Sequence, residues 1–285
     1  MMNTISTIYL PMALAIIMLG LGLSLTVADF RRVLTQPRAV AVALVVQVIL
    51  LPSVAFGLCY LFALTPEFAV GLMLLAASPG GTSANLFSHL ARGDVALNIT
   101  LTAVNSLLAI ITLPLMINLA LVHFIGEGKR VPLQFGKVAQ VVAIVIVPVL
   151  IGMLLRHRRP AMAIRFEKPV KIFSMLFLLA IVALVMISGW QAIVAHLPSV
   201  GGAMLTFNLL SLAIGYQLAR LAGLGRPQAT AIGMEIGVHN SALAISLALS
   251  PLLLNSPLMA IPPTLYSPIM MLTAGAFAGW LTRKR

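Results

Sequence analysis

The chain has 285 residues, of which 61% are hydrophobic and 8% are charged, and its mean hydropathy is +1.09. Soluble domains carry about 25% charged residues, so this composition excludes that class and indicates an integral membrane protein. The net charge of +12 does not imply a nucleic-acid partner, because membrane proteins collect Lys and Arg on their cytoplasmic loops.

Nine apolar segments are long enough to cross about 30 Å of hydrocarbon as helices, which predicts an all-α integral membrane fold with nine transmembrane helices. The first begins near the N-terminus and lacks the basic region and cleavage site of a signal peptide, so we interpret it as a span. The predicted spans are 8–26, 38–63, 69–90, 95–124, 137–155, 170–189, 200–221, 227–254 and 258–281.

The distribution of Lys and Arg predicts the orientation of these spans. If the N-terminus is outside, the outside loops hold only Lys129, Arg130 and Lys137, which leaves fifteen of the eighteen basic residues inside. We therefore expect a multi-pass protein of the cell membrane with a cytoplasmic C-terminus, in the inner membrane if the source is Gram-negative. The longest loop is expected at Arg156–Lys168, with a topological role and contact to anionic lipid.

Two spans contain interruptions that combine small residues with side-chain oxygens. Ser78–Asn85 interrupts the third span, and Glu235–Ser241 interrupts the eighth. A membrane tolerates irregular backbone only where protein or a water-filled cavity satisfies the freed polar groups. The two spans run in opposite directions, so we interpret spans one to four and six to nine as inverted repeats, with the fifth as a linker. We expect the interruptions to meet and form an ion and substrate site.

Glu235 is the residue in these spans that most requires a partner. An ionised carboxylate at the bilayer centre costs about 2.5–3.5 kcal/mol on insertion scales, and no Lys or Arg lies mid-span to pair with it. A mobile cation or a proton must therefore neutralise it. Hard cations prefer oxygen ligands, and several are offered nearby: Thr82, Ser83 and Asn85 in the first interruption, Asn98, Thr102 and Asn105 on one face of span four, and Gln47 in span two.

These residues also have structural interpretations. The polar residues of span four are typical of interhelical hydrogen bonds, and His239 could be a packed neutral side chain, a proton carrier or a ligand. Prolines such as Pro52 are expected to kink their spans. The single Cys59 excludes an intramolecular disulfide, and no Cys and His have zinc spacing. We expect no cofactor other than coupling ions.

The sequence around these residues resembles the bile acid:sodium symporter family. The resemblance is carried by "SPGGTSANLFSHLARGDVALNITLTAVNS" from Ser78 to Ser106 and by "EIGVHNSALAISLAL" from Glu235 to Leu249. It is supported by "GLSLTVADFRRVLTQPRAV" from Gly22 to Val40. It implies a core domain with two crossing discontinuous helices, here 38–125 and 200–281, beside a panel domain, here 8–26 and 137–189.

The resemblance also implies ligand sets. One sodium site would use Asn85, Asn98, Thr102 and Glu235, and the other Gln47, Glu235, His239 and the carbonyls of Ile236 and Val238. The substrate would lie near Thr82, Ser83, Asn105, Asn240 and Ser241. The chain departs from the family pattern in having nine spans where some members have ten. Ala84 stands in place of a common serine, and His239 in place of a common glutamine.

The sequence therefore predicts a secondary active transporter that couples sodium entry to uptake of a small organic anion by alternating access, with membrane lipid but no obligate protein partner. The alternative is a proton-coupled carrier or exporter in which Glu235 and His239 titrate. An intramembrane enzyme would need paired acids or a nucleophile with a base, and only one acid lies mid-span, so we expect no enzyme. A passive channel or a sensor is a further alternative.

Overall fold

The computed structural model describes residues 10–126, 135–188, 190–251 and 253–283. Several predicted features include residues outside these ranges. These are positions 8, 9 and 189 at the ends of two expected spans, position 252 within the eighth, Lys129 and Arg130 of the outside loop, and Lys284 and Arg285 at the C-terminus.

Every regular element of the described residues is a helix, as expected for backbone that must satisfy its own hydrogen bonds in lipid. The first half of the chain contains α2 (Leu10–Ser24), α3 (Val27–Thr35), α4 (Pro37–Val45), η2 (Val46–Leu50), α5 (Leu51–Leu61), α6 (Pro66–Ala77), α7 (Thr82–Leu90) and α8 (Val95–Phe124). The second half contains α9 (Phe135–Arg158), α10 (Pro160–Ser188), α11 (Trp190–His196), η4 (Leu197–Gly201), α12 (Gly202–Leu221), α13 (Arg226–Gly237), α14 (Ser241–Leu249) and α15 (Pro257–Arg283).

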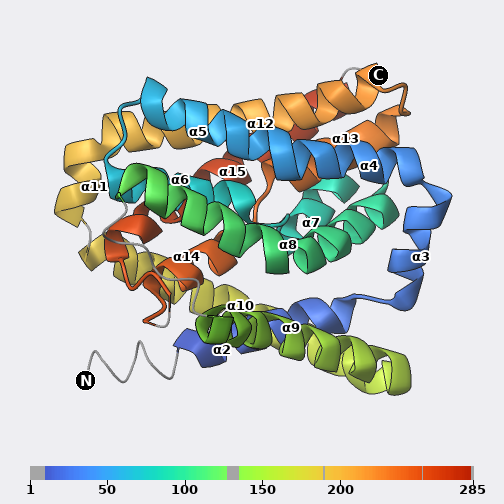
Figure 1. Ribbon diagram of the computed structural model, residues 1–285. Helices are drawn as coiled ribbons and strands as arrows, with labels where there is room; N and C mark the ends of the chain where they lie inside the picture. Colours follow the sequence, from blue (N-terminus) through green and yellow to red (C-terminus); the bar gives the residue numbers. More distant parts are fainter. Residues whose placement is uncertain (1–9, 127–134, 189, 252, 284–285) are drawn as a thin grey trace.

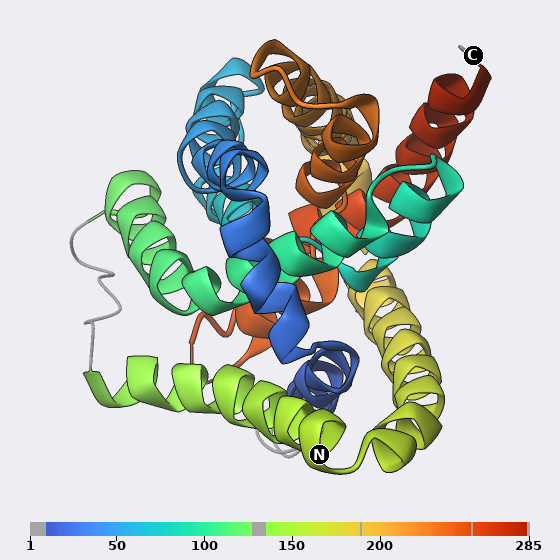
Figure 2. The same cartoon turned by 90° about the vertical axis from the view of Figure 1, so that its right-hand side faces the viewer.

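The helices form two groups. In Figure 1, α2, α9 and α10 pack against one another at the bottom, and the remaining long helices lie above them. In the upper group α12 packs on α13, α14 on α15, and α6 on α8 and α15, an arrangement that Figure 2 shows from the side. Every residue of α6 from Phe68 to Ala77 is buried. Protein surrounds this helix, which explains why it is apolar on all sides.

Three described stretches combine the length and the hydropathy needed to cross a bilayer, judged on those two properties alone: Pro37–Leu61, Val95–Phe124 and Ile193–Leu221. The helices Ala15–Ser24 and Pro66–Ala77 are apolar but shorter. The third and eighth predicted spans are each divided between two short helices. A criterion of helix length therefore misses the spans that are interrupted by a break.

Two connections differ from the expectation. The predicted loop Arg156–Lys168 is wrong, because α9 continues to Arg158 and α10 begins at Pro160. Proline is favourable at the first helical position, where no amide donor is needed, so the basic segment after it is helical. The second difference is α3, a short helix that joins the lower group to the upper one on the right of Figure 1. Its start is fixed by Asp29, which accepts hydrogen bonds from the backbone nitrogen and hydroxyl of Thr26.

The irregularity predicted at Pro52 takes the form of a π-helical turn. Val46–Leu50 is π-helical and leads directly into α5, whose second residue is Pro52. A proline removes one backbone donor from the helix and clashes with the preceding turn. Gln47 lies within this widened turn, and turns of this kind occur frequently at functional sites.

Candidate functional site at two interrupted helices

The first break, at residues 78–81, separates α6 from α7. Ser78 has an extended conformation, with φ −72° and ψ 142°, because Pro79 disfavours helical geometry in the residue before it. Two glycines follow, and both are in close contact with the second break. A β-carbon at Gly80 would fall on the carboxyl group of Glu235, and one at Gly81 would lie 3.0 Å from the carbonyl oxygen of His239.

The second break, at residues 238–240, separates α13 from α14 without a proline. Val238 leaves helical geometry at φ −115° and ψ 84°, and the side chain of Asn240 accepts a hydrogen bond from the Leu243 nitrogen at 3.0 Å. Asn240 therefore starts α14 as its N-cap. The carbonyl freed at Gly237 accepts hydrogen bonds from Asn208 and from the Tyr266 hydroxyl, each at 2.8 Å.

The two breaks lie against each other, which confirms the expectation that they meet. The Gly81 nitrogen donates to the Val238 carbonyl at 2.7 Å, and the Asn240 nitrogen donates to the Pro79 carbonyl at 2.8 Å. These bonds form an isolated antiparallel bridge between Gly80 and His239. Backbone groups that leave both helices are thus paired with each other, as burial requires.

Glu235 lies beside this bridge in the last turn of α13 and is 0% exposed, so its predicted burial is confirmed. Its carboxyl group accepts hydrogen bonds from the Thr102 hydroxyl at 2.6 Å and from the Asn105 amide at 3.1 Å, and the Gly80 backbone also bonds to it. These partners are all neutral. A buried carboxyl group whose partners are neutral donors is suited to hold a cation or a proton.

On the elements that meet at the two breaks, several amide and imidazole atoms are buried and have no hydrogen-bond partner among the described residues. They are the amide oxygens of Gln47, Asn85, Asn98 and Asn105 and the Nε2 atom of His239. Bonds made by the neighbouring nitrogens fix three of these amides. Asn98 donates to the Ala231 carbonyl at 2.7 Å, Gln47 to the carbonyls of Ala76 and Ser78 at 3.2 and 3.1 Å, and Asn105 to Glu235.

An unsatisfied buried acceptor costs about 1–3 kcal/mol, so this cluster of them needs a physical reason. Oxygen atoms of amides, hydroxyls and carboxylates are the ligands that hard cations prefer. Among the described residues, no three His, Cys, Asp or Glu side chains gather into a site for a metal ion. The donor set at the breaks therefore suits a singly charged hard cation better than a transition metal.

The residues predicted for the first sodium site come from α7, α8 and α13. Thr102 bonds directly to Glu235, and the free oxygens belong to Asn85 and Asn98. Those predicted for the second site meet at the first break, where Gln47 and the Nδ1 atom of His239 both donate to the Ser78 carbonyl. Because a carbonyl only accepts, Nδ1 carries the proton and the free Nε2 atom carries a lone pair.

The two backbone carbonyls predicted for the second site lie on either side of the helix end. Ile236 is in the last turn of α13, and the Val238 carbonyl already accepts the Gly81 nitrogen. A carbonyl has two lone pairs, so this bond leaves acceptor capacity at Val238.

The residues predicted for the substrate come from α7, α8, the second break and α14. Thr82 is exposed and Ser83 is half-buried in the first turn of α7, where no side chain caps the helix. Asn105 is buried against Glu235, Asn240 caps α14, and the Ser241 hydroxyl faces the Met270 sulfur at 3.8 Å. Asn240 and Ser241 thus have structural contacts that their sequence pattern did not indicate.

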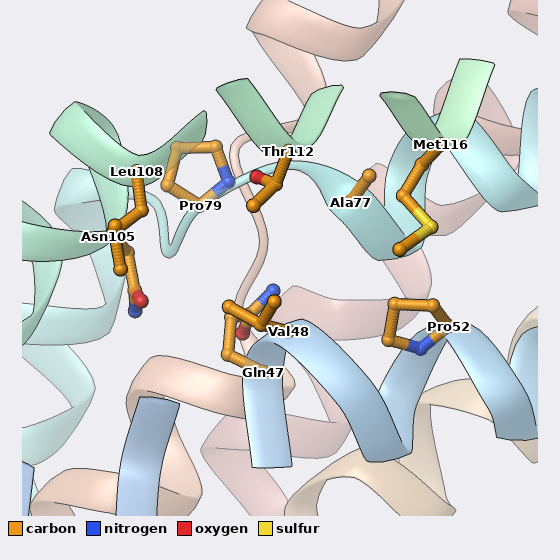
Figure 3. Close-up of a pocket in the computed structure, with 9 residues that line it drawn as sticks. All are labelled: Gln47, Val48, Pro52, Ala77, Pro79, Asn105, Leu108, Thr112 and Met116. Atoms are coloured by element: carbon orange, nitrogen blue, oxygen red, sulfur yellow. The ribbon is translucent and has the colours of Figure 1, made fainter. Parts of the chain in front are cut away.

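A small cavity lies between η2, α5, the first break and α8. Figure 3 shows Gln47, Pro79 and Asn105 lining it together with Val48, Pro52, Ala77, Leu108, Thr112 and Met116. Its volume of about 10 Å³ leaves room for about one water molecule. Two of its lining residues, Gln47 and Asn105, carry a free amide oxygen.

Sequence reasoning missed Asn208 and Tyr266. Asn208 donates to the Gly237 carbonyl and to the Tyr266 hydroxyl, and its oxygen accepts a hydrogen bond from Thr273. Both residues are 0% exposed. The available signal was a lone asparagine inside an apolar span, which indicates a buried hydrogen-bond role.

Comparison with known proteins identifies the family of this chain. A family model described as the Sodium Bile acid symporter family matches residues 11–196, which include the first break and α8. The chain belongs to the sodium bile acid symporter family. It is therefore a membrane transporter rather than an enzyme.

Relatives of this family match nearly the whole chain, including the second break. The "Uncharacterized sodium-dependent transporter YocS" of Bacillus subtilis is 28% identical over 97% of this chain and 84% of its own length. "Probable sodium/metabolite cotransporter BASS1, chloroplastic" of Arabidopsis thaliana is 28% identical over 97% of this chain and 67% of its own. The human "Ileal sodium/bile acid cotransporter" is 25% identical over 98% and 80%.

Proposed function

We propose that the chain is a sodium-coupled symporter that moves a small organic anion across the cell membrane by alternating access. The observation that carries the proposal is Glu235, a fully buried carboxyl group with neutral partners beside buried amide oxygens that have none. Sodium dependence in the printed names of its relatives supports the same ion.

The mechanism rests on a difference in stability between empty and loaded states. Sodium ions at Asn85, Asn98, Thr102 and Glu235, and at Gln47, Glu235, His239 and the Ile236 and Val238 carbonyls, neutralise the carboxylate and fill the free acceptors. The bound ions hold the two breaks together. Substrate affinity is then higher in the ion-bound state, and the coupling is reciprocal.

An anionic substrate is supported by the first turn of α7. Thr82 and Ser83 begin this helix without a side-chain cap, and the N-terminal end of a helix favours negative charge. Asn105, Asn240 and Ser241 lie around the same two breaks and complete the proposed substrate site. The cavity of about 10 Å³ beside them is too small for an organic anion, so this region must open further to admit the substrate.

We place that movement between two domains. The core is 38–125 with 200–281, and the panel is 8–26 with 137–189, which includes the lower helices of Figure 1. The nine-span, N-outside arrangement with inverted repeats belongs to the same proposal. It is supported by two polar residues in corresponding spans, because Gln47 satisfies carbonyls at the first break and Asn208 satisfies one at the second.

A proton-coupled carrier or exporter is the alternative, and the free Nε2 atom of His239 beside the breaks favours it. In that mechanism Glu235 and His239 titrate, and flux follows a pH gradient without sodium. Both mechanisms use Glu235, so the driving ion must be tested directly.

The test is uptake of labelled organic anions into proteoliposomes, with sodium or potassium outside and a fixed pH. We expect uptake only with the inward sodium gradient and its loss in Glu235→Gln. Glu67→Gln, which makes the same change in the first turn of α6, is the matched control and is expected to transport normally. Sodium-independent uptake driven by a pH gradient would replace the sodium mechanism with the proton-coupled one.

A further inference from the structure

A second cavity lies at the ends of the lower helices, away from the two breaks. It has a volume of about 500 Å³, within the range of ligand pockets. Leu25, Thr26 and Val27, where the chain passes from α2 to α3, form one side. The end of α9 and the first residue of α10 form the other, with Met153, Leu154, Arg156, His157 and Pro160.

The chemistry of the lining is amphipathic. Leu25, Val27, Met153 and Leu154 provide an apolar wall, and Arg156 and His157 provide basic groups at the helix end. The surrounding segment is basic as well, with exposed side chains at Arg158, Arg159, Arg165 and Lys168. A cavity of this kind fits a ligand with an apolar part and an anionic part.

The two acidic residues near the cavity have partners of their own. Glu167 contacts Arg156 at 3.5 Å, and Asp29 binds Thr26 and contacts Arg32 at 3.4 Å. A guanidinium group carries five N–H donors, and the contact to Glu167 that the described residues show uses one of them at 3.5 Å, which leaves others for a phosphate. The net charge at the opening therefore favours an anion.

The outer face of α9 continues the apolar wall of the cavity. Val147, Leu150, Ile151 and Leu154 recur at helical spacing on one face, and each is about half exposed. In a membrane this face contacts acyl chains. Leu154 belongs both to this face and to the cavity, so an acyl chain along α9 ends next to Arg156 and His157.

We propose that this cavity binds an anionic phospholipid, with its phosphate at Arg156 and His157 and an acyl chain along the exposed face of α9. Basic pockets between membrane helices near the bilayer surface bind anionic head groups in this way. The cavity includes the joint between α2 and α3, which connects the lower helices to the upper ones. The bound lipid stabilises this joint.

The experiment measures thermal unfolding of the purified full-length chain in detergent during titration with dioleoyl phosphatidylglycerol. Dioleoyl phosphatidylcholine and inorganic phosphate are titrated in parallel. We expect a saturable rise in Tm with phosphatidylglycerol and no such rise with phosphatidylcholine or inorganic phosphate. In the double variant Arg156→Ala/His157→Ala, we expect the half-maximal lipid concentration to rise about tenfold or more, because charge-assisted bonds to the phosphate are lost.

Two further variants separate the cavity from general charge and from folding. Arg158→Ala removes a positive charge from an exposed residue outside the cavity. Glu167→Gln breaks the ion pair with Arg156 but leaves the positive charge of Arg156 in place. Arg158→Ala is expected to respond to phosphatidylglycerol as the unmodified chain does, and Glu167→Gln at least as strongly, each measured against its own lipid-free Tm. Equal stabilisation by phosphatidylcholine or inorganic phosphate, or an equal loss in Arg158→Ala, would overturn the proposal.

Discussion

The break between α6 and α7 is produced by backbone constraints, whereas the break between α13 and α14 carries charged and polar side chains. Pro79, Gly80 and Gly81 shape the first, and the nearest side chains are supplied by other helices. The second break supplies His239 and Asn240 itself, and the last turn of α13 next to it supplies Glu235. The small residues of the first break thus leave room for Glu235 and for the backbone of the second break.

The side chains that satisfy the freed carbonyls differ in the same way. Asn208 uses both ends of its amide: the nitrogen donates to the Gly237 carbonyl and to the Tyr266 hydroxyl, and the oxygen accepts a hydrogen bond from Thr273. Gln47 uses its nitrogen at the first break and keeps a buried oxygen without a partner. Asn208 therefore has the contacts of a structural residue, whereas Gln47 combines such contacts with a free oxygen that we propose binds sodium.

The largest effect is expected for Gly80→Ala, which tests whether the first break is shaped to fit the second. The new methyl group overlaps the Glu235 carboxyl, and overpacking of this kind costs about 1–3 kcal/mol, occasionally more. We expect a lower Tm in detergent and loss of sodium-dependent uptake. Gly57→Ala is the control, because its β-carbon meets nothing within 4 Å. Equal behaviour of the two variants would contradict the close fit.

The pair Asn208→Leu and Gln47→Leu separates stability from ion binding. Asn208→Leu removes one of two donors from the Gly237 carbonyl and is expected to destabilise the protein by about 1–3 kcal/mol, with sodium dependence retained. Gln47→Leu should reduce the rise in Tm that sodium produces, while the Tm without sodium changes little. Thermal unfolding with and without sodium measures both. If Asn208→Leu instead abolished the sodium response and Gln47→Leu only lowered the Tm, Asn208 would be the ion ligand and Gln47 the structural residue.

Thr102→Val is expected to raise the sodium concentration for half-maximal stabilisation about tenfold, because a hydrogen bond to a charged group is worth about 1.5–3 kcal/mol. The hydroxyl of Thr102 lies 2.6 Å from Glu235, and valine keeps the side-chain shape. Thr100→Val is the matched control on α8, because the hydroxyl of Thr100 donates to the Ala96 carbonyl and no bond to Glu235 is present among the described residues. If both variants change the sodium response equally, Thr102 does not act through Glu235.

The smallest effect is expected for His239→Gln. Glutamine can retain the hydrogen bond to the Ser78 carbonyl and replaces the free Nε2 atom with an oxygen, a better ligand for a hard cation. We expect a modest gain in apparent sodium affinity or a flatter pH profile of uptake. A variant that changes neither property would identify His239 as a packing residue against Phe207, on which its ring is stacked at 5.5 Å.

Local chemistry explains what the sequence could predict. Pro79 and its glycines marked the first break, and a carboxylate far from any basic loop marked Glu235 as buried. The α3 helix, the helical segment after Pro160 and the bonds from Asn208 were missed. Asn208 and Gly237 are 29 residues apart, and nothing in either local pattern indicates the other. The cap made by Asn240 was also missed, because an asparagine in a break suits a ligand and an N-cap equally.

The ion and substrate assignments remain predictions for a similar reason. The sequence offered more oxygens than a site needs, and the structure distinguishes those with partners from those without. Thr82 and Ser83 lie at an open helix end, but their exposure does not identify the anion they would contact.

The most direct test of the central claim is a sodium titration of thermal stability in detergent, with choline replacing sodium at constant ionic strength. A ligand that binds only the native state stabilises it by about 2.7 kcal/mol at a hundredfold excess over Kd. We predict a saturable rise in Tm with sodium that is absent in Glu235→Gln and present in Glu67→Gln. No rise with sodium, or the same rise in Glu235→Gln, would contradict a sodium site at the two breaks.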